Sequence, residues 1–553
     1  MTVGTIAATP IQARARTIAV SRRRVLVMMV LFGGMFGSIG ARLAAVMGQA
    51  GDVETVDRLQ AAPALPLASS RGDLTDRNGL ILATTLPSVS LTADPKLVID
   101  PIEASLRLSK VLPGLDADRL IADLSSDRRF VWLRRGLTPA QQYAVNRLGI
   151  PGLAFQDEER RFYPAGSLTA HAIGFTDIDA RGIAGLEKSL DTRLAAGEAV
   201  RLSIDLRLQQ MARVELQAAI DTFGAEGGSA LIMDVDTGEI LAMVSLPDFD
   251  PADPARASPR ALFNRNTLGV YEMGSSFKIF NTAMALESGT STLSSTYDSR
   301  PIRVGRFLIR DAEQRPDGPM AVTEIFQHSS NIGSVHMLEA AGLDRQKEFL
   351  ARLGLTRPSP LDLPEIGAPM LPRPWSRISG MTISYGYGMA VSPVQLVTAV
   401  AAVVNGGILR PPTLLRQDPG RPVPGRRVLA PEISQAMRPL MRSVVTGGSA
   451  TRADVPGYFV GGKTATADKA ALGGYNRRAR LSSFVGVFPM QAPRYVVFAM
   501  LDNPQPVRGT FGFAFARWNA APLGGRIIAR MGPMVGIVPA DPQDPAVVAA
   551  LSL

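Results

Sequence analysis

The sequence contains no cysteine and only three histidines among its 553 residues. Without cysteine the chain cannot form a disulfide, which is compatible with an oxidising compartment. His171, His328 and His336 lack the spacing of metal ligands, and no His-Glu-x-x-His sequence is present. A Gly-x-Ser-x-Gly elbow and the glycine-rich motifs of nucleotide-binding proteins are also missing. The sequence therefore predicts no metal and no cofactor, and it argues against zinc enzymes and α/β-hydrolases.

Lysine is scarce as well, because the chain has seven lysines against 52 arginines. Arginine stays protonated under ordinary conditions, whereas a buried lysine can lose its proton and accept one from a hydroxyl group. Because this chain uses arginine for ordinary positive charge, each of its few lysines is a candidate for a catalytic role. Lys278 and Lys463 stand out among the seven because of the residues around them.

The formal net charge of +10 is concentrated at the N-terminus. Residues 1–50 hold six arginines and no acidic residue, which leaves +4 for the other 503 residues. No basic cluster interleaved with aromatic residues appears. We therefore expect no nucleic-acid partner.

An uncharged apolar run follows the arginines at positions 22–24. It starts at Val25 and extends to Met47 if the Arg42 side chain reaches the membrane interface. We predict a cytoplasmic tail over residues 1–24 and one transmembrane helix over residues 25–47, with the remainder outside the inner membrane. A cleaved signal peptide is the alternative, but the run is long for one and lacks a clear cleavage pattern. Gly33 and Gly37 give this helix a stripe of small residues on which a partner helix could pack.

Three short motifs carry the candidate chemistry. Ser275 and Lys278 are three residues apart, which brings a nucleophile and a base to one face of a helical turn. Ser329-Ser330-Asn331 lies between two helical patterns, and its alternative interpretation is a helix N-cap. Lys463-Thr464-Ala465-Thr466 follows a glycine pair and reads as a strand. Each motif alone is weak evidence, but their order together resembles the active-site signature of penicillin-binding proteins and serine β-lactamases.

The remainder of the chain extends this resemblance to class B penicillin-binding proteins. Residues 161–164 and 182–187 are similar to blocks of the N-terminal pedestal of that family, although they also read simply as turns and a helix start. A helix over residues 206–223 and a hairpin of strands 229–234 and 239–244 are similar to the opening of the transpeptidase domain. We predict a mixed α+β pedestal over residues 48–205. Residues 206–553 would form the penicillin-binding transpeptidase domain, an α/β unit with an antiparallel sheet flanked by helices.

The resemblance also implies a role for each motif residue. Ser275 would attack a carbonyl group, with Lys278 as the leading candidate for its base. Ser329 would relay a proton to the leaving amine, and Asn331 would hold the substrate amide. Lys463 would orient Ser329 electrostatically. Thr464 and Thr466 would meet the substrate carboxylate, with the Thr466 N–H as an oxyanion donor.

Two positions depart from the family pattern. Ala465 stands where the family has glycine, so a methyl group could crowd the substrate or shift the strand. Met273 stands where proline usually precedes the Gly-Ser pair. The departure at Ala465 leaves open a weakly active or non-catalytic division scaffold that retains the fold.

The sequence thus resembles a septal peptidoglycan cross-linking enzyme that acts on D-Ala-D-Ala stem peptides and is acylated by β-lactams. The Ser-Tyr-Gly-Tyr-Gly sequence at 384–388 resembles the division-specific members, of the FtsI kind, more than the elongation-type enzymes, which remain an alternative. A D,D-carboxypeptidase or a β-lactamase is the nearest hydrolytic rival. The resemblance implies a bacterial inner-membrane location with a periplasmic catalytic domain. It also implies partnership with a glycosyltransferase of the SEDS type and other division proteins.

Overall fold

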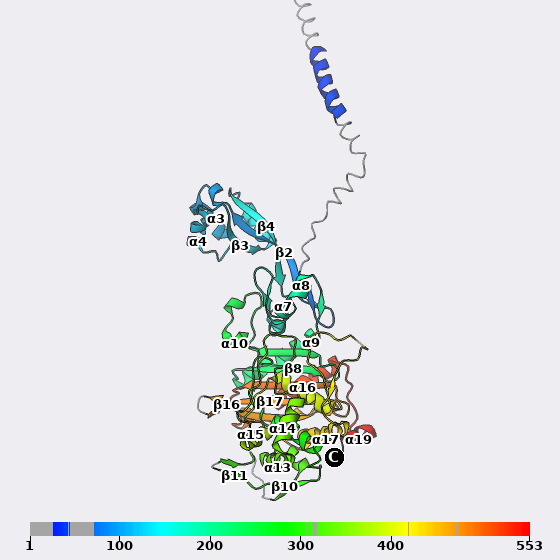
Figure 1. Ribbon diagram of the computed structural model, residues 1–553. Coiled ribbons are helices and arrows are strands. Elements are labelled where there is room, and N and C mark those ends of the chain that lie inside the picture. The colour runs from blue at the N-terminus through cyan, green and yellow to red at the C-terminus, as the bar shows by residue number, and fades with distance from the viewer. Residues whose placement is uncertain are drawn as a thin grey trace, which may run out of the picture. The chain divides into compact units, whose positions relative to one another are not determined.

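A computed structural model describes residues 26–42, 44, 71–305, 307–312, 318–418, 420–471 and 474–553. The chain divides into two compact units, Met1–Ser69 and Ser70–Leu553. In the first unit, residues 26–42 form a helix whose side chains are all exposed (Figure 1). Among the described residues, none of the helices is both long and apolar enough to span a bilayer. The span over residues 25–47 stays a prediction, and the tail at 1–24 lies outside the described residues.

The second unit begins with a small sheet and its own hydrophobic core. β1 (Leu74–Thr75) pairs with β2 (Ile81–Ala93) across a turn in which Asp76 Oδ1 accepts the N–H groups of Asn78 and Leu80 at 2.7 and 2.9 Å. β2 also pairs with β3 (Val131–Leu137) and β4 (Leu153–Phe162), and β1 pairs with β7 (Val200–Arg201). The helices beside this core are α3 (Pro101–Val111), α4 (Ala117–Leu124) and α5 (Pro139–Asn146). The expected mixture of strands and helices is confirmed.

The two sequence blocks at 161–164 and 182–187 meet in a buried cluster of charges. Glu187 is fully buried and accepts from the Nε atoms of Arg71 and Arg161, each at 2.7 Å. Arg71 also pairs with Asp191 at 2.7 Å. Because a buried charge is tolerated only with partners, the blocks are more than turns and a helix start. They join residues that are 26 to 116 positions apart in the chain.

The larger sheet has the strand order β16–β17–β18–β8–β9, with every neighbouring pair antiparallel (Figure 1). The bounds are β8 (Gly227–Asp234), β9 (Ile240–Leu246), β16 (Gly461–Ala471), β17 (Gly474–Phe488) and β18 (Tyr495–Asp502). β8 and β9 confirm the predicted hairpin. All residues of β8 and β18 are buried, which explains why these strands are apolar without alternation.

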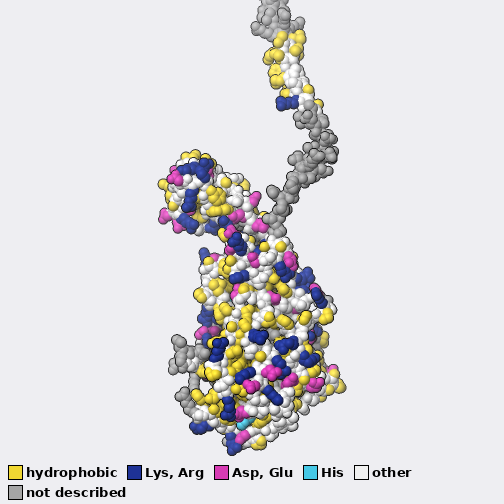
Figure 2. Space-filling model, in the orientation of Figure 1, with side chains coloured by type: hydrophobic (Ala, Val, Ile, Leu, Met, Phe, Trp, Pro, Cys, Tyr) yellow, Lys and Arg dark blue, Asp and Glu magenta, His cyan; other side chains and the backbone are white. Residues whose placement is uncertain are grey.

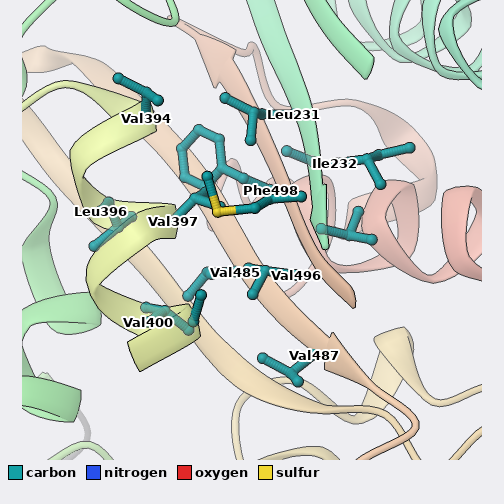
Figure 3. Packing of buried hydrophobic residues seen from close by; sticks show 14 of the residues in the cluster. Leu231, Ile232, Val394, Leu396, Val397, Val400, Val485, Val487, Val496 and Phe498 are labelled. Atoms are coloured by element: carbon teal, nitrogen blue, oxygen red, sulfur yellow. The ribbon is translucent and has the colours of Figure 1, made fainter. Parts of the chain in front are cut away.

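Helices cover both faces of this sheet. Val394, Val397 and Val400 of α16 (Pro393–Val404) face Val485 and Phe498 on one side (Figure 3). On the other side, α18 (Ala520–Met534) comes so close to Phe484 that a Cβ built on Gly524 would lie 2.4 Å from its ring. Successive strand residues point to opposite faces of the sheet, so Phe484 and Val485 pack against different helices. α9 (Leu206–Phe223) packs beside α18, with the bounds predicted from the sequence.

The remaining elements connect these layers or build the region of the motifs. The helices are α6 (Ala170–Ile173), α7 (Gly185–Ser189), α8 (Asp191–Ala195), α10 (Pro259–Leu262), α11 (Lys278–Glu287), α12 (Val322–Gln327), α13 (Asn331–Ala341), α14 (Leu343–Arg352), α15 (Arg377–Ser384), α17 (Pro431–Gly447) and α19 (Pro545–Leu551). The strands are β5 (Phe175–Thr176), β6 (Gly182–Ala184), β10 (Thr296–Asp298), β11 (Ile302–Val304), β12 (Phe307–Ile309), β13 (Pro319–Ala321), β14 (Ile408–Leu409) and β15 (Arg426–Arg427).

Candidate active site

Ser275 lies in a short 3₁₀ turn, Gly274–Phe277, directly before α11. The spacing of the motif predicts a helical turn that includes Ser275, whereas the α-helix itself begins three residues later, at Lys278. Gly274 has a φ of +48°, a backbone conformation that glycine adopts without steric cost. Ser275 remains partly exposed while Ser276, Phe277 and Lys278 are buried. The turn therefore presents one hydroxyl group at the surface of an apolar helix.

Lys278 connects the first motif to the second. Its Nζ atom lies 3.2 Å from Ser275 Oγ, 3.0 Å from Ser329 Oγ, 2.6 Å from the Ser329 carbonyl oxygen and 2.7 Å from Asn331 Oδ1. The side chain is 1% exposed. Burial, followed by the nearby charge of Lys463, lowers the pKa of Lys278 well below its ordinary value. The structure thus brings Ser275, Lys278, Ser329 and Asn331 into one hydrogen-bonded group.

The second motif occupies the junction between α12 and α13, as the sequence predicts. Ser330 is the N-cap of α13, and its Oγ accepts the Gly333 N–H at 3.0 Å. Ser329 stands just before it with a φ of +62°. Left-handed backbone is uncommon for a residue with a side chain, and such residues often occur at functional sites. The residues of this motif therefore have two roles: Ser330 caps the helix, and Ser329 and Asn331 face Lys278.

Lys463 is fully buried on β16, in register with Val485 of β17. Its Nζ atom has no hydrogen-bond partner among the described residues, so it lies outside the group around Lys278. Burial lowers the pKa of Lys463 to about 7. Since its charge in turn lowers the pKa of Lys278, the two amines are electrostatically coupled.

Thr464 and Thr466 point to the sheet face opposite Lys463, because strand residues alternate. Thr464 Oγ1 lies 2.6 Å from Ser449 Oγ, and Thr466 Oγ1 accepts the Ala516 N–H at 3.0 Å. A threonine hydroxyl that accepts one hydrogen bond can still donate another. β16 is an edge strand of the sheet, so one of its sides is open to a ligand backbone.

Ala465 directs its methyl group toward the turn that carries the nucleophile. A Cβ built on Gly274 would lie 3.4 Å from the Ala465 Cβ, and Ala465 is 3% exposed. The methyl group is therefore packed beneath Gly274, where a side chain is missing, and it fills space inside the protein.

The Ser-Tyr-Gly-Tyr-Gly segment touches the same turn. The Gly274 N–H donates to the Gly386 carbonyl oxygen at 3.1 Å, and a Cβ built on Gly386 would lie 1.8 Å from the Gly274 oxygen. Glu272 Oε1 accepts the Gly388 N–H at 2.6 Å and the Tyr475 hydroxyl at 2.9 Å. Burial raises the pKa of Glu272. These contacts fasten the nucleophile turn to residues more than one hundred positions away.

Asp311 is a site residue that the motif analysis misses. Its Oδ1 accepts the backbone N–H groups of Asn331 and Ile332 at 2.6 and 3.1 Å, while the Arg310 carbonyl accepts from Asn331 Nδ2 at 2.9 Å. Asp311 also acts against the lowering of the Lys278 pKa. An isolated Arg-Asp pair after a short strand gives no signal by itself, so only the fold could identify it. Among the described residues, no group of three or more His, Asp or Glu side chains could hold a metal ion.

Comparison with known proteins agrees with this geometry. Residues 228–517 match the penicillin-binding protein transpeptidase domain, and residues 66–204 match the penicillin-binding protein dimerisation domain. The probable peptidoglycan D,D-transpeptidase FtsI of Caulobacter vibrioides is 39% identical over 543 residues, covering 95% of this chain and 91% of that protein. The peptidoglycan D,D-transpeptidase FtsI of Escherichia coli K12 is 32% identical over 494 residues, covering 83% of each chain.

The fold is similar to that of solved relatives. Penicillin-binding protein 3 from Mycobacterium tuberculosis, in complex with ampicillin, has a TM-score of 0.69 and 26% identity, covering 87% of this chain and 98% of that one. The two family domains together span most of the second unit. The chain therefore belongs to the class B penicillin-binding proteins, the FtsI-like family of serine peptidoglycan D,D-transpeptidases.

Proposed function

We propose that Ser275 is the nucleophile with which this enzyme cross-links septal peptidoglycan during cell division. The observation that carries the proposal is the position of Lys278 Nζ, 3.2 Å from Ser275 Oγ and within 3.0 Å of three oxygens of the second motif. A buried lysine with a lowered pKa is suited to accept a proton from a serine hydroxyl.

The partners of Lys278 also direct its lone pair. A neutral amine has two N–H donors and one lone pair. The Ser329 carbonyl and Asn331 Oδ1 can only accept hydrogen bonds, so they take both donors. The lone pair is then left for the hydroxyl groups of Ser275 and Ser329. This arrangement supports Lys278 as the general base.

In the proposed reaction, Ser275 attacks the D-Ala-D-Ala peptide bond of a stem peptide. Lys278 takes the hydroxyl proton, and Ser329 passes a proton to the amine of the departing D-alanine as the acyl-enzyme forms. An amine of a second stem peptide then attacks the ester and restores Ser275. The N–H groups of Ser275 and Thr466 would stabilise the oxyanion. Lys463 would hold Ser329 electrostatically.

Substrate recognition is assigned to the second and third motifs. Asn331 would bind the amide backbone of the stem peptide, and Thr464 and Thr466 would donate to its terminal carboxylate. We propose that Ala465 is compatible with activity, because its methyl group packs against Gly274. β-Lactams would acylate Ser275, since the family binds them in place of the peptide.

The location and partners follow the same proposal. Residues 1–24 would be cytoplasmic, residues 25–47 would cross the bacterial inner membrane once, residues 48–205 would form the pedestal, and residues 206–553 would form the periplasmic transpeptidase domain. The exposed apolar helix at 26–42 supports this topology. A SEDS-type glycosyltransferase and other division proteins would be the membrane partners, supplying and directing the glycan that is cross-linked.

Fluorescent penicillin labelling of the full-length protein in detergent tests the nucleophile. We expect covalent label on the wild type, none on Ser275→Ala, and normal label on Ser276→Ala, whose hydroxyl is buried and makes no hydrogen bond to any described residue. Circular dichroism melts would show that each variant is folded. Folded wild-type protein without label would contradict the proposal and favour a non-catalytic scaffold.

Product analysis with a pentapeptide donor and an amine acceptor tests the reaction type. We expect D-alanine release together with a cross-linked dimer. Release of D-alanine with only hydrolysed tetrapeptide would instead identify a carboxypeptidase.

A further inference from the structure

A pocket of about 820 Å³ lies in the second unit among residues that the reaction does not use. It is bounded by the end of α14 and the loop after it, by α16 and β14, and by segments 410–412 and 424–426. None of the three motifs lines it. Its volume is within the range of small-molecule binding sites.

Four arginines line this pocket: Arg352, Arg357, Arg410 and Arg426. In the part of the chain that the structure describes, none of them forms an ion pair with a carboxylate, although other arginines such as Arg71, Arg213 and Arg442 do. Glu348 is the carboxylate on the pocket wall, and it is exposed. Figure 2 shows one face of this unit, on which basic, acidic and hydrophobic side chains are interspersed. The pocket therefore has a strong excess of positive charge.

Several polar atoms around the pocket are buried without a partner. Arg352 Nε, Arg410 Nε and Nη1, and Ser359 Oγ are shielded from solvent and make no hydrogen bond to the described residues. Ser359 as a whole is only 8% exposed. Buried donors are nearly always paired in native proteins, since an unpaired one costs about 1–3 kcal/mol or more. These donors lack an acceptor among the described residues, and a bound ligand could supply one.

Most of the rest of the wall is apolar, although Gln395 and Thr398 also line it. The apolar part includes leucine and proline side chains, among them Leu353, Leu409, Pro358, Pro360, Pro411 and Pro412. A small inorganic ion would leave this surface uncovered. A ligand with an oxyanion at one end and an apolar body matches both halves of the pocket.

We propose that this pocket binds an organic oxyanion, a carboxylate or a phosphate ester with an apolar body, at the guanidinium groups of Arg352 and Arg410. The planar guanidinium suits either oxyanion, because both present paired oxygens. Ser359 would supply an additional donor. The ligand is a second one, bound apart from Ser275, so the proposal does not rest on the catalytic assignment.

Calorimetric titration of the full-length protein in detergent tests this proposal. The probes are phenyl phosphate and 3-phenylpropionate, with 3-phenylpropanol as the uncharged control. We expect saturable binding of at least one anion and none of the alcohol. Binding of phenyl phosphate alone would identify a phosphate ligand, and binding of phenylpropionate alone a carboxylate ligand. The absence of saturable anion binding would overturn the proposal.

Two arginine variants locate the binding. Arg410→Gln should lower the affinity for the anion at least tenfold. Arg421→Gln should leave the affinity for the anion unchanged, because Arg421 is exposed and does not line the pocket. Equal affinity in both variants would place the anion elsewhere and reject the site.

Thermal unfolding without ligand provides a separate measurement. Arg410→Met keeps most of the apolar stem and removes a charge with two unpartnered buried nitrogens, so we expect its Tm to rise. A lower Tm would indicate that Arg410 is satisfied in the unliganded protein and would count against the proposal. Penicillin labelling reports separately on Ser275, so failure of the catalytic assignment would not be confused with failure here.

Discussion

Asp311 Oδ1 accepts the backbone N–H of Asn331 at 2.6 Å, and so holds the first residue of α13 beside Lys278. The carboxylate acts as a cap that comes from a distant strand connection, whereas Ser330 caps the same helix locally. The position of Asn331 is therefore set from outside its own motif.

Replacing this carboxylate tests its positioning role. Asp311→Ala should slow acylation by a β-lactam about fivefold, because losing a helix cap costs about 1 kcal/mol and releases Asn331. Asp311→Asn retains an acceptor and should recover most of the rate. Stopped-flow acylation measures both, with Asp344→Ala as the control for an exposed aspartate. A rate in Asp311→Ala equal to the wild-type rate would show that Asn331 keeps its place without the cap.

The pH dependence of acylation should follow the two buried lysines. Lys278 must be neutral to act as a base, so the rate should rise with pH and then level off. Lys463 lowers the pKa of Lys278 as a like charge, so Lys463→Met should move the acidic limb to higher pH. The shift arises mainly below about pH 7, where Lys463 is itself protonated. Lys347→Met is the control, and an acidic limb that stays in place in Lys463→Met would exclude this coupling.

Gly386 should not tolerate a side chain, because a Cβ there would collide with the backbone of Gly274 in addition to straining the backbone of Gly386 itself. Gly386→Ala would bring a methyl group within 1.8 Å of the Gly274 oxygen and should abolish most labelling of Ser275. Gly342 has nearly the same φ, +95° against +94°, but nothing lies within 4 Å of its built Cβ. Gly342→Ala should therefore cost about 1–3 kcal/mol of backbone strain and leave labelling intact. Equal loss of labelling in the two variants would indicate that backbone strain alone accounts for the effect.

The alanine in the third motif should prove tolerated. Ala465→Gly should change the acylation rate less than about threefold, since loss of one oxyanion donor would instead cost a hundredfold or more. The Tm of the variant should fall slightly, because a buried methyl group is lost and glycine is unfavourable in a strand. Ala465→Ser is a small polar comparison at the same place. A hundredfold faster Ala465→Gly enzyme would mean that the native site is impaired.

Glu187 should be essential for stability because it neutralises two buried arginines. Glu187→Gln leaves Arg71 and Arg161 underpaired, and breaking a buried ion pair costs about 3–5 kcal/mol. Denaturant unfolding should show this loss. Glu198→Gln breaks the exposed pair with Arg193 and should change stability little. Similar midpoints for both variants would contradict the role of burial.

Much of the fold could be predicted from the sequence because it depends on local patterns. α9 has its predicted bounds, since Asp205 caps its start and Gly224 ends it in a left-handed conformation. The β8–β9 hairpin was equally recognisable from two apolar runs around a turn. The order of the three motifs indicated the family, because only a few residue types can supply a nucleophile, a base and their partners.

Other features depended on residues far apart in the chain. The sequence alone did not indicate that the α-helix begins at Lys278, that Ala465 packs against Gly274, or that Asp311 caps Asn331. Nor did it indicate that four arginines, none of them ion-paired among the described residues, line one pocket. Secondary-structure propensity and motif spacing depend on residues that are close together in the chain. The sequence by itself therefore determined many of the helices and strands and the type of catalytic chemistry. Burial, electrostatic coupling and contact between distant segments exist only once the chain is packed. The tertiary structure alone therefore decided the burial that lowers the pKa of Lys278 and Lys463, and the place of each supporting residue.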